Sequence, residues 1–187
     1  NLSWKLNIVS KGLQYDNEFG KERLSREEQI KRYKEEFDNI NNLSIKKINF
    51  SNDKNNVLFT EDLEIQAEGY AQNTGGKLMF ALNAFDQNSY VPKKYKTREF
   101  PFEIERGFCY EDESIITIPS NYKVDSVPNE QNVSNEFGNY ICKIEVNGNN
   151  VIYKRKLLIK SGYYAADKYE SYRKFRELVA RSENNKM

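Results

Sequence analysis

Residues 140–159, YICKIEVNGNNVIYKRKLLI, decide the fold of this chain. The first half alternates apolar and polar residues with the period of a half-buried β-strand, the apolar members being Tyr140, Cys142, Ile144 and Val146. Asn147-Gly148 is a strong signal for a tight turn between two antiparallel strands. The apolar run that follows, 151–159, returns the chain, so the stretch predicts a hairpin. In it Arg155 falls on the buried side, and we expect it near a sheet edge.

Similar alternation predicts strands elsewhere in the chain. The expected segments are 2–8, 43–50, 57–67, 78–82, 100–108, 115–118, a short strand near Val124, and the hairpin above. The parity of apolar residues changes between Ile45 and Ile48, which indicates a bulge or a short turn. The turn formers at 73–76 predict that strand 57–67 pairs with strand 78–82.

Two helices are expected, one near each end of the chain. Ser25 as N-cap and Glu28 three residues later form a capping box, and apolar spacing continues it as a helix over about 25–39. Asp167 with Glu170 suggests a second capping box. It opens an amphipathic helix that runs almost to the C-terminus.

These elements predict a mainly β (α+β) fold: an antiparallel β-sandwich with one helix near the N-terminus and an amphipathic helix at the C-terminus. Residues 1–187 are expected to form one compact β-rich unit. The polar and basic stretch 86–97, which contains Pro92, is a candidate internal seam.

Composition excludes several classes of function. The 187 residues include 29 basic and 28 acidic ones, a net charge of +1, which argues against a general nucleic-acid binder. No apolar run is long enough to insert into a membrane. The sequence contains no histidine, so Cys-His and Ser-His-Asp catalysis and the usual zinc sites cannot be assembled within it. We expect no catalytic residue, metal or other cofactor in this chain.

Other candidate groups have structural interpretations as well as functional ones. Cys109 and Cys142 are expected to be buried free thiols, with a disulfide as the alternative. The acidic clusters at 61–64, 111–113 and Asp125 are interpreted as solvated turns and strand ends, and the basic patches 93–96 and 154–156 as solvated faces. Most aromatic residues follow the apolar tracks of strands and helices and are assigned to the core. Tyr163 and Tyr164 lie off any clear track, which makes them a candidate binding surface.

A series of short motifs from residue 98 onward carries a resemblance to a known family. They are REFPF at 98–102, IPSNYKV at 118–124, Val127-Pro128, FGNY at 137–140, the stretch 149–158, and the aromatic entry and helix at 164–179. Their order resembles the C-terminal β domain, itself of unknown function, of transglutaminase-like proteins of the Gram-negative cell envelope. Those proteins combine an N-terminal β domain of unknown function with a papain-like transglutaminase core. The resemblance assigns residues 98–187 to the family-like domain.

The resemblance implies a non-catalytic accessory domain, periplasmic or envelope-associated, that packs on the upstream core of the same polypeptide or positions its substrate. The family's catalytic residues belong to that core, and none carries over to this chain. A chain that starts at Asn1 without a signal sequence is expected to be processed or part of a longer protein. The alternative is a free-standing β-sandwich module that binds glycan or protein through Tyr163 and Tyr164. An enzyme that uses carboxylates alone is a third hypothesis.

Overall fold

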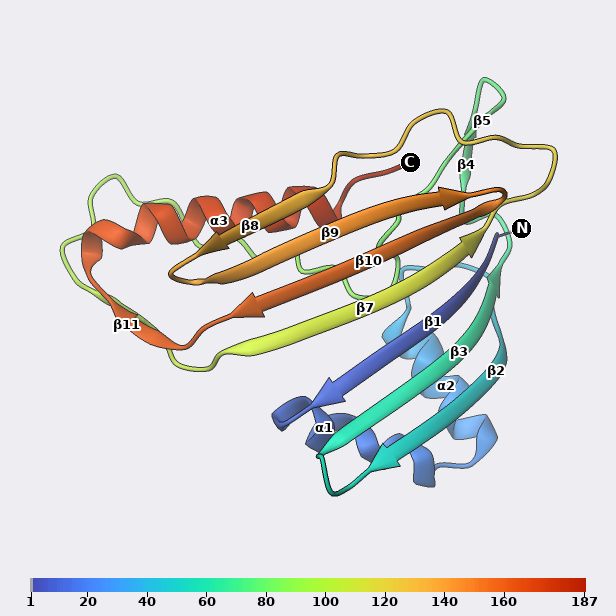
Figure 1. Cartoon of the computed structure of the whole chain (residues 1–187), viewed down its shortest axis with the longest axis horizontal. Coiled ribbons are helices and arrows are strands. Elements are labelled where there is room, and N and C mark those ends of the chain that lie inside the picture. The colour runs from blue at the N-terminus through green and yellow to red at the C-terminus, as the bar shows by residue number, and fades with distance from the viewer. Residues whose placement is uncertain (1) are drawn as a thin grey trace.

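A seven-stranded antiparallel sheet forms the centre of the molecule (Figure 1). The computed structural model describes residues 2–187, so Asn1 lies outside the described residues. In order across the sheet the strands are β2 (Leu43–Asp53), β3 (Leu58–Ala67), β1 (Leu2–Lys11), β7 (Phe108–Thr117), β10 (Asn150–Ile159), β9 (Gly138–Asn147) and β8 (Gln131–Asn135). Strands β1–β3 therefore meet the C-terminal strands where β1 pairs with β7.

The predicted hairpin at 140–159 is confirmed. It forms β9 and β10, which pair from Asn147 with Asn150 to Gly138 with Ile159, around a turn in which Gly148 has φ 58°. Arg155 is buried as expected, but the prediction of an edge position is wrong. Strand β10 lies inside the sheet because both β7 and β9 pair with it.

The N-terminal helix and its capping box are also confirmed. Helix α2 (Arg26–Glu36) begins after Ser25, whose hydroxyl accepts from the Glu28 amide at 3.3 Å, while the Glu28 carboxylate accepts from the Ser25 amide at 2.9 Å. Helix α1 (Leu13–Glu18) and the 3₁₀ helix η1 (Phe19–Arg23) were not predicted from the sequence, because they are too short to show a repeating apolar period. The bulge in β2 is confirmed between Ile45 and Lys47.

Three strand predictions need correction. Strand β3 does not pair with the segment after the Gly75-Gly76 turn, because β1 and β2 already occupy both of its edges. That turn instead closes a small hairpin of β4 (Gln72–Thr74) and β5 (Lys77–Met79). The expected strand at 100–108 is reduced to β6 (Phe102–Ile104), which pairs with β11 (Gly162–Tyr164), and there is no strand near Val124 in the structure of residues 2–187.

The C-terminal helix is confirmed, but its predicted cap is wrong. Asp167 lies within a 3₁₀ turn, η2 (Ala166–Lys168), and α3 (Tyr169–Glu183) follows with Lys168 at its N-cap and no side-chain cap. The predicted apolar stripe is present, because Tyr172, Phe175 and Val179 are buried.

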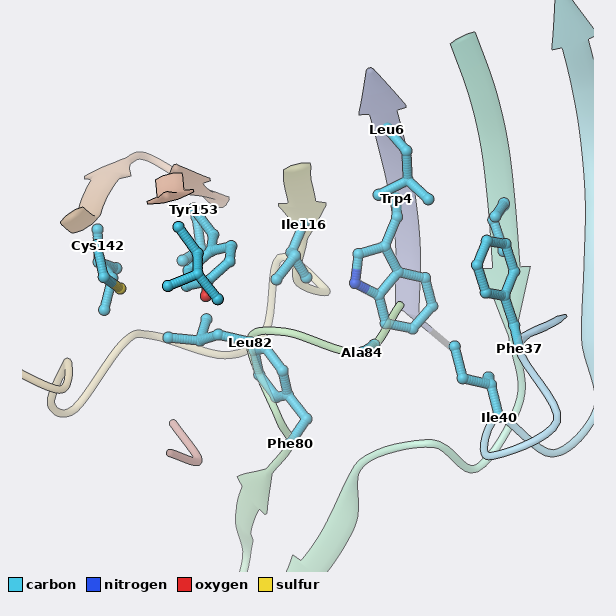
Figure 2. Packing of buried hydrophobic residues seen from close by; sticks show 14 of the residues in the cluster. Trp4, Leu6, Phe37, Ile40, Phe80, Leu82, Ala84, Ile116, Cys142 and Tyr153 are labelled. Carbon is cyan, nitrogen blue, oxygen red and sulfur yellow. The ribbon is translucent and has the colours of Figure 1, made fainter. Parts of the chain in front are cut away.

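Both helical regions pack on the same face of the sheet, which we call the inner face. Figure 2 shows that segment 80–84 crosses this face and links its two halves: Leu82 lies near Tyr153 and Ile116, and Ala84 lies near Trp4. The last residue joins this segment, since Met187 and Phe80 exchange two backbone hydrogen bonds of 2.9 and 3.0 Å. One layer is thus the large sheet, and the other consists of helices, loops and short hairpins. The predicted mainly β, antiparallel fold with a helix near each end is confirmed.

Candidate functional site

The structure separates the two tyrosines that the sequence analysis singled out. Tyr163 is 72% exposed and stands opposite Glu103 in the β6–β11 pair. Tyr164 is only half-buried, but its ring lies 5.3 Å from the ring of Phe102 and 4.9 Å from that of Phe137, measured between centroids. Tyr163 therefore remains a surface candidate, whereas the ring of Tyr164 belongs to the aromatic packing beneath α3.

The two cysteines are free thiols, as the sequence analysis expected. Cys142 is buried and Cys109 is half-buried, on strands that β10 separates. Burial raises the pKa of both thiols. A raised pKa disfavours the thiolate, which is the reactive form, so neither residue has the environment of a catalytic nucleophile.

A cavity of about 510 Å³ opens on the inner face, between the α1–α2 region and the loop after Leu82. Its apolar lining includes Leu6, Ile8, Phe37, Leu82, Phe85 and Tyr153. Its acidic lining includes Glu18, Glu36, Glu61, Asp86 and Asp112. This volume falls in the range of small-molecule sites, which combine apolar walls with a few polar groups.

One group of cavity acids surrounds Lys21, and we call it the Lys21 cluster. The Lys21 ammonium, 2% exposed, lies 2.7 Å from Glu18, 3.0 Å from Glu36 and 3.1 Å from Glu61. The Tyr33 hydroxyl donates a hydrogen bond to the Glu61 carboxylate. Burial raises the pKa of Glu61, and although burial opposes the charge on Lys21, the three carboxylates together raise the pKa of that lysine. Three carboxyl groups thus share one ammonium.

A second group, the Arg155 cluster, has the same excess of acid. The Arg155 guanidinium lies 2.7 Å from Glu183 of α3 and 2.8 Å from Asp86 in the loop, and it also binds Asp112 of β7. Burial raises the pKa of Glu183 to about 7 and that of Asp112 to about 6, against the opposite effect of Arg155. Here too three carboxyl groups share one cation.

The two clusters flank one residue of β1. Ile8 pairs with Glu61 of β3 on one side and with Asp112 of β7 on the other. Because neighbouring strands are about 4.8 Å apart, the Cα atoms of these acids are separated by roughly 10 Å. An aliphatic floor between two acidic walls favours an organic cation over a bare ion. Within residues 2–187, no group of three or more His, Cys, Asp or Glu side chains is arranged to hold a metal.

This site corrects the interpretation of the charged clusters as solvated surface for Glu61, Asp112 and Arg155, whereas Asp125 and the lysines at 93–94 and 96 are exposed as expected. Glu61 is 1% exposed and Arg155 is 2% exposed, whereas their sequence neighbours Asp62 and Lys154 face the other side of the sheet. Strand alternation was the available signal, because Glu61 shares the parity of Leu63 and Ile65. The partners of these residues come from distant segments, so periodicity alone could not identify them.

None of the described helices is long and apolar enough to span a bilayer.

Comparison with known families places most of this architecture in one of them. Residues 76–187 match the family described as a Domain of Unknown Function with solved-structure structure, DUF3858. Comparisons with curated proteins and with solved structures found no match. The matched range includes the loop with Asp86, strand β7 and helix α3, which together supply the Arg155 cluster. Since the match covers more than half of the 187 residues, the chain belongs to the DUF3858 family.

Proposed function

We propose that this chain is a non-catalytic accessory domain of a transglutaminase- or protease-like envelope protein. It packs on the catalytic core of that protein or positions the substrate for it, in the periplasm or at the cell envelope. The upstream core of the same polypeptide is its proposed partner. The family itself is one of unknown function, so the context of a transglutaminase-like core rests on the order of motifs from residue 98 onward.

One observation carries the non-catalytic part of the proposal. The chain has no histidine to act as a base, and burial raises the pKa of both of its thiols. Nucleophilic catalysis needs the opposite arrangement, in which a neighbouring base or cation lowers the pKa of the nucleophile. We therefore expect the isolated chain to show no amide hydrolysis and no acyl transfer, and sustained turnover by the purified chain would contradict the proposal.

The accessory role can be tested by the size of the native protein. Envelope fractions of the source cells would be separated by denaturing electrophoresis and probed with an antibody against this chain. We expect a band much larger than a 187-residue protein, and mass spectrometry of that band should give peptides of a transglutaminase-like core. A soluble band no larger than this chain would contradict the accessory role.

The exposed ring of Tyr163 supports a second candidate function, a free-standing module that binds glycan or protein. Exposed aromatic rings bind sugars and peptides through their faces. If this hypothesis is correct, Tyr163→Ala abolishes saturable binding of envelope polysaccharides, while Tyr90→Ala, which removes another exposed tyrosine, leaves it unchanged. The absence of saturable binding by the wild-type chain would count against the module.

A further inference from the structure

We propose that the acid-lined cavity binds an aliphatic diammonium, with its carbon chain over Ile8 and its two ammonium groups at the Lys21 and Arg155 clusters. This inference does not depend on the accessory role, because it concerns only residues within the chain. A ligand with a single ammonium group would reach only one of the two clusters, and such a ligand therefore serves as a comparison in the experiment.

Charge is the first argument for this ligand. Each cluster contains three carboxyl groups and a single cation, so two carboxyl groups in each exceed what Lys21 or Arg155 neutralises. The side chains of Glu36 and Asp86 are 40% and 41% exposed, so a ligand in solution can reach them. Unlike-charge attraction across a partly buried site is several times stronger than in bulk water.

Shape is the second argument. The acids opposite Ile8 are about two strand spacings apart, roughly 10 Å between Cα atoms, and their side chains point toward the same face. Ile8 lies between them, and Leu6 and Leu82 add to the apolar lining of the cavity. A chain of four or five methylene groups can cover this apolar strip and still bring one ammonium to each cluster.

An unsatisfied hydroxyl is the third and independent argument. Tyr153 lines the cavity and is 3% exposed, yet its hydroxyl oxygen has no hydrogen-bond partner in the part of the chain that the structure describes. Figure 2 shows this oxygen beside Leu82, which also lines the cavity. A buried hydroxyl without a partner is unfavourable, and an ammonium group is a donor that it can accept from.

The test is calorimetric titration of the full chain with 1,5-diaminopentane, with 1,5-pentanediol as the neutral control of equal length. We expect saturable binding of the diamine and none of the diol. Nα-acetyl-lysine amide, which carries only one ammonium group, is titrated separately, and we expect it to bind more weakly than the diamine because it can reach only one cluster. If the diamine does not bind saturably, or if the diol or the lysine derivative binds as tightly, the proposal is wrong.

Matched variants locate the binding. Glu36→Gln with Asp86→Asn removes two half-exposed cavity charges, whereas Glu35→Gln with Asp125→Asn removes two charges outside the cavity. We expect the first pair to weaken binding on the order of tenfold and the second to leave it within about twofold. An equal loss in both pairs would mean general attraction to a charged surface and would overturn the proposal.

Methyl resonances supply a second readout that needs no variant. Ile8 and Leu82 line the cavity, whereas Ile152 and Leu158 of β10 alternate with its buried residues and lie on the opposite face of the sheet. Addition of the diamine should shift the methyl signals of the first two residues with the same saturation curve as the calorimetry. Shifts confined to the methyl signals of Ile152 and Leu158 would place the ligand on the opposite face of the sheet and contradict the proposal.

Discussion

Arg155 illustrates how a single buried charge joins distant parts of the chain. Its guanidinium binds Asp86, Asp112 and Glu183, which belong to a loop, a strand and the last helix. Removing the cation leaves the buried carboxyl group of Glu183 and the largely buried one of Asp112 without compensation, so Arg155→Met should lower the free energy of unfolding by about 3–5 kcal/mol. Chemical denaturation followed by circular dichroism would measure the loss.

The neighbouring residue gives the control for this prediction. The side chain of Lys154 is 45% exposed and lies 3.6 Å from Glu113 on the other face of the sheet. Lys154→Met should change the free energy of unfolding by no more than about 0.5 kcal/mol. If Arg155→Met lost no more stability than is expected for Lys154→Met, the buried ion cluster would contribute little to the free energy of unfolding.

Gly138 and Gly148 are predicted to differ in their tolerance of a side chain. A Cβ atom at Gly138 would lie 1.8 Å from the carbonyl oxygen of Leu158, and φ there is 155°. At Gly148 φ is 58°, but nothing lies within 4 Å of such an atom. Gly138→Ala should therefore cost about 3 kcal/mol or more, and Gly148→Ala about 1 kcal/mol.

Thermal unfolding of these two variants would test the difference. The melting temperature should fall several-fold further for Gly138→Ala than for Gly148→Ala. Equal melting temperatures of the two variants would contradict the close approach of the Gly138 backbone to the Leu158 carbonyl group.

At the level of elements, the capping box of α2 leads to a separate prediction. Ser25→Ala removes the hydroxyl that accepts from the Glu28 amide, which should cost about 1 kcal/mol. Hydrogen exchange should show faster opening of the first turn of α2. Ser161→Ala, at an exposed position outside any helix, is the control and should leave this exchange unchanged.

Elements with a local cause were predictable from the sequence, and those with a distant cause were not. The β9–β10 hairpin follows from alternation and Asn147-Gly148, and α2 follows from Ser25 and Glu28. The predicted pairing of β3 with segment 78–82 failed because β1, from the start of the chain, and β2 occupy the two edges of β3. Asp167 failed as a cap because the chain makes a 3₁₀ turn there before α3.

The candidate site was less predictable than the fold for the same reason. Alternation placed Arg155 on the buried side, but no local pattern links it to Asp86 or Glu183. The cavity acids come from α1, α2, β3, β7 and a loop, and sequence spacing carries no information on their convergence. Tyr163 and Tyr164 appeared equivalent in the sequence, and only the β6–β11 pair shows that they face different surroundings.

At the scale of the whole molecule, the excess of buried acid predicts the pH dependence of stability. Burial raises the pKa of Glu183 to about 7 and that of Asp112 to about 6, so near pH 6 the folded chain binds more protons than the unfolded chain. The free energy of unfolding should therefore decrease, on the order of 2 kcal/mol, as pH rises from about 5 to about 7.5. Exposed acids with a lowered pKa, such as Asp53, act in the opposite direction, and only at lower pH.

Urea unfolding at a series of pH values would measure this dependence. Glu183→Gln removes one of the titrating groups, so the slope between pH 5 and 7.5 should become shallower. Glu35→Gln, an exposed change on α2, should leave the slope as it is. A wild-type chain that gains stability over this range would contradict the assigned environments.

The arrangement of the sheet leads to a last prediction, which concerns the candidate seam at 86–97. Strands β1 and β7 pair from Ser3 with Thr117 to Ile8 with Asp112, so the N-terminal strands and the family-matched region form one sheet. Segment 80–84 also packs across both halves of the inner face (Figure 2). We therefore expect one cooperative unfolding transition, with equal calorimetric and van't Hoff enthalpies.

A chain shortened to residues 98–187 exposes the edge of β7 and lacks Phe80, Leu82 and Asp86, so it should not fold. Two separate transitions in the full chain, or a stable fragment, would instead mean that the seam divides two domains.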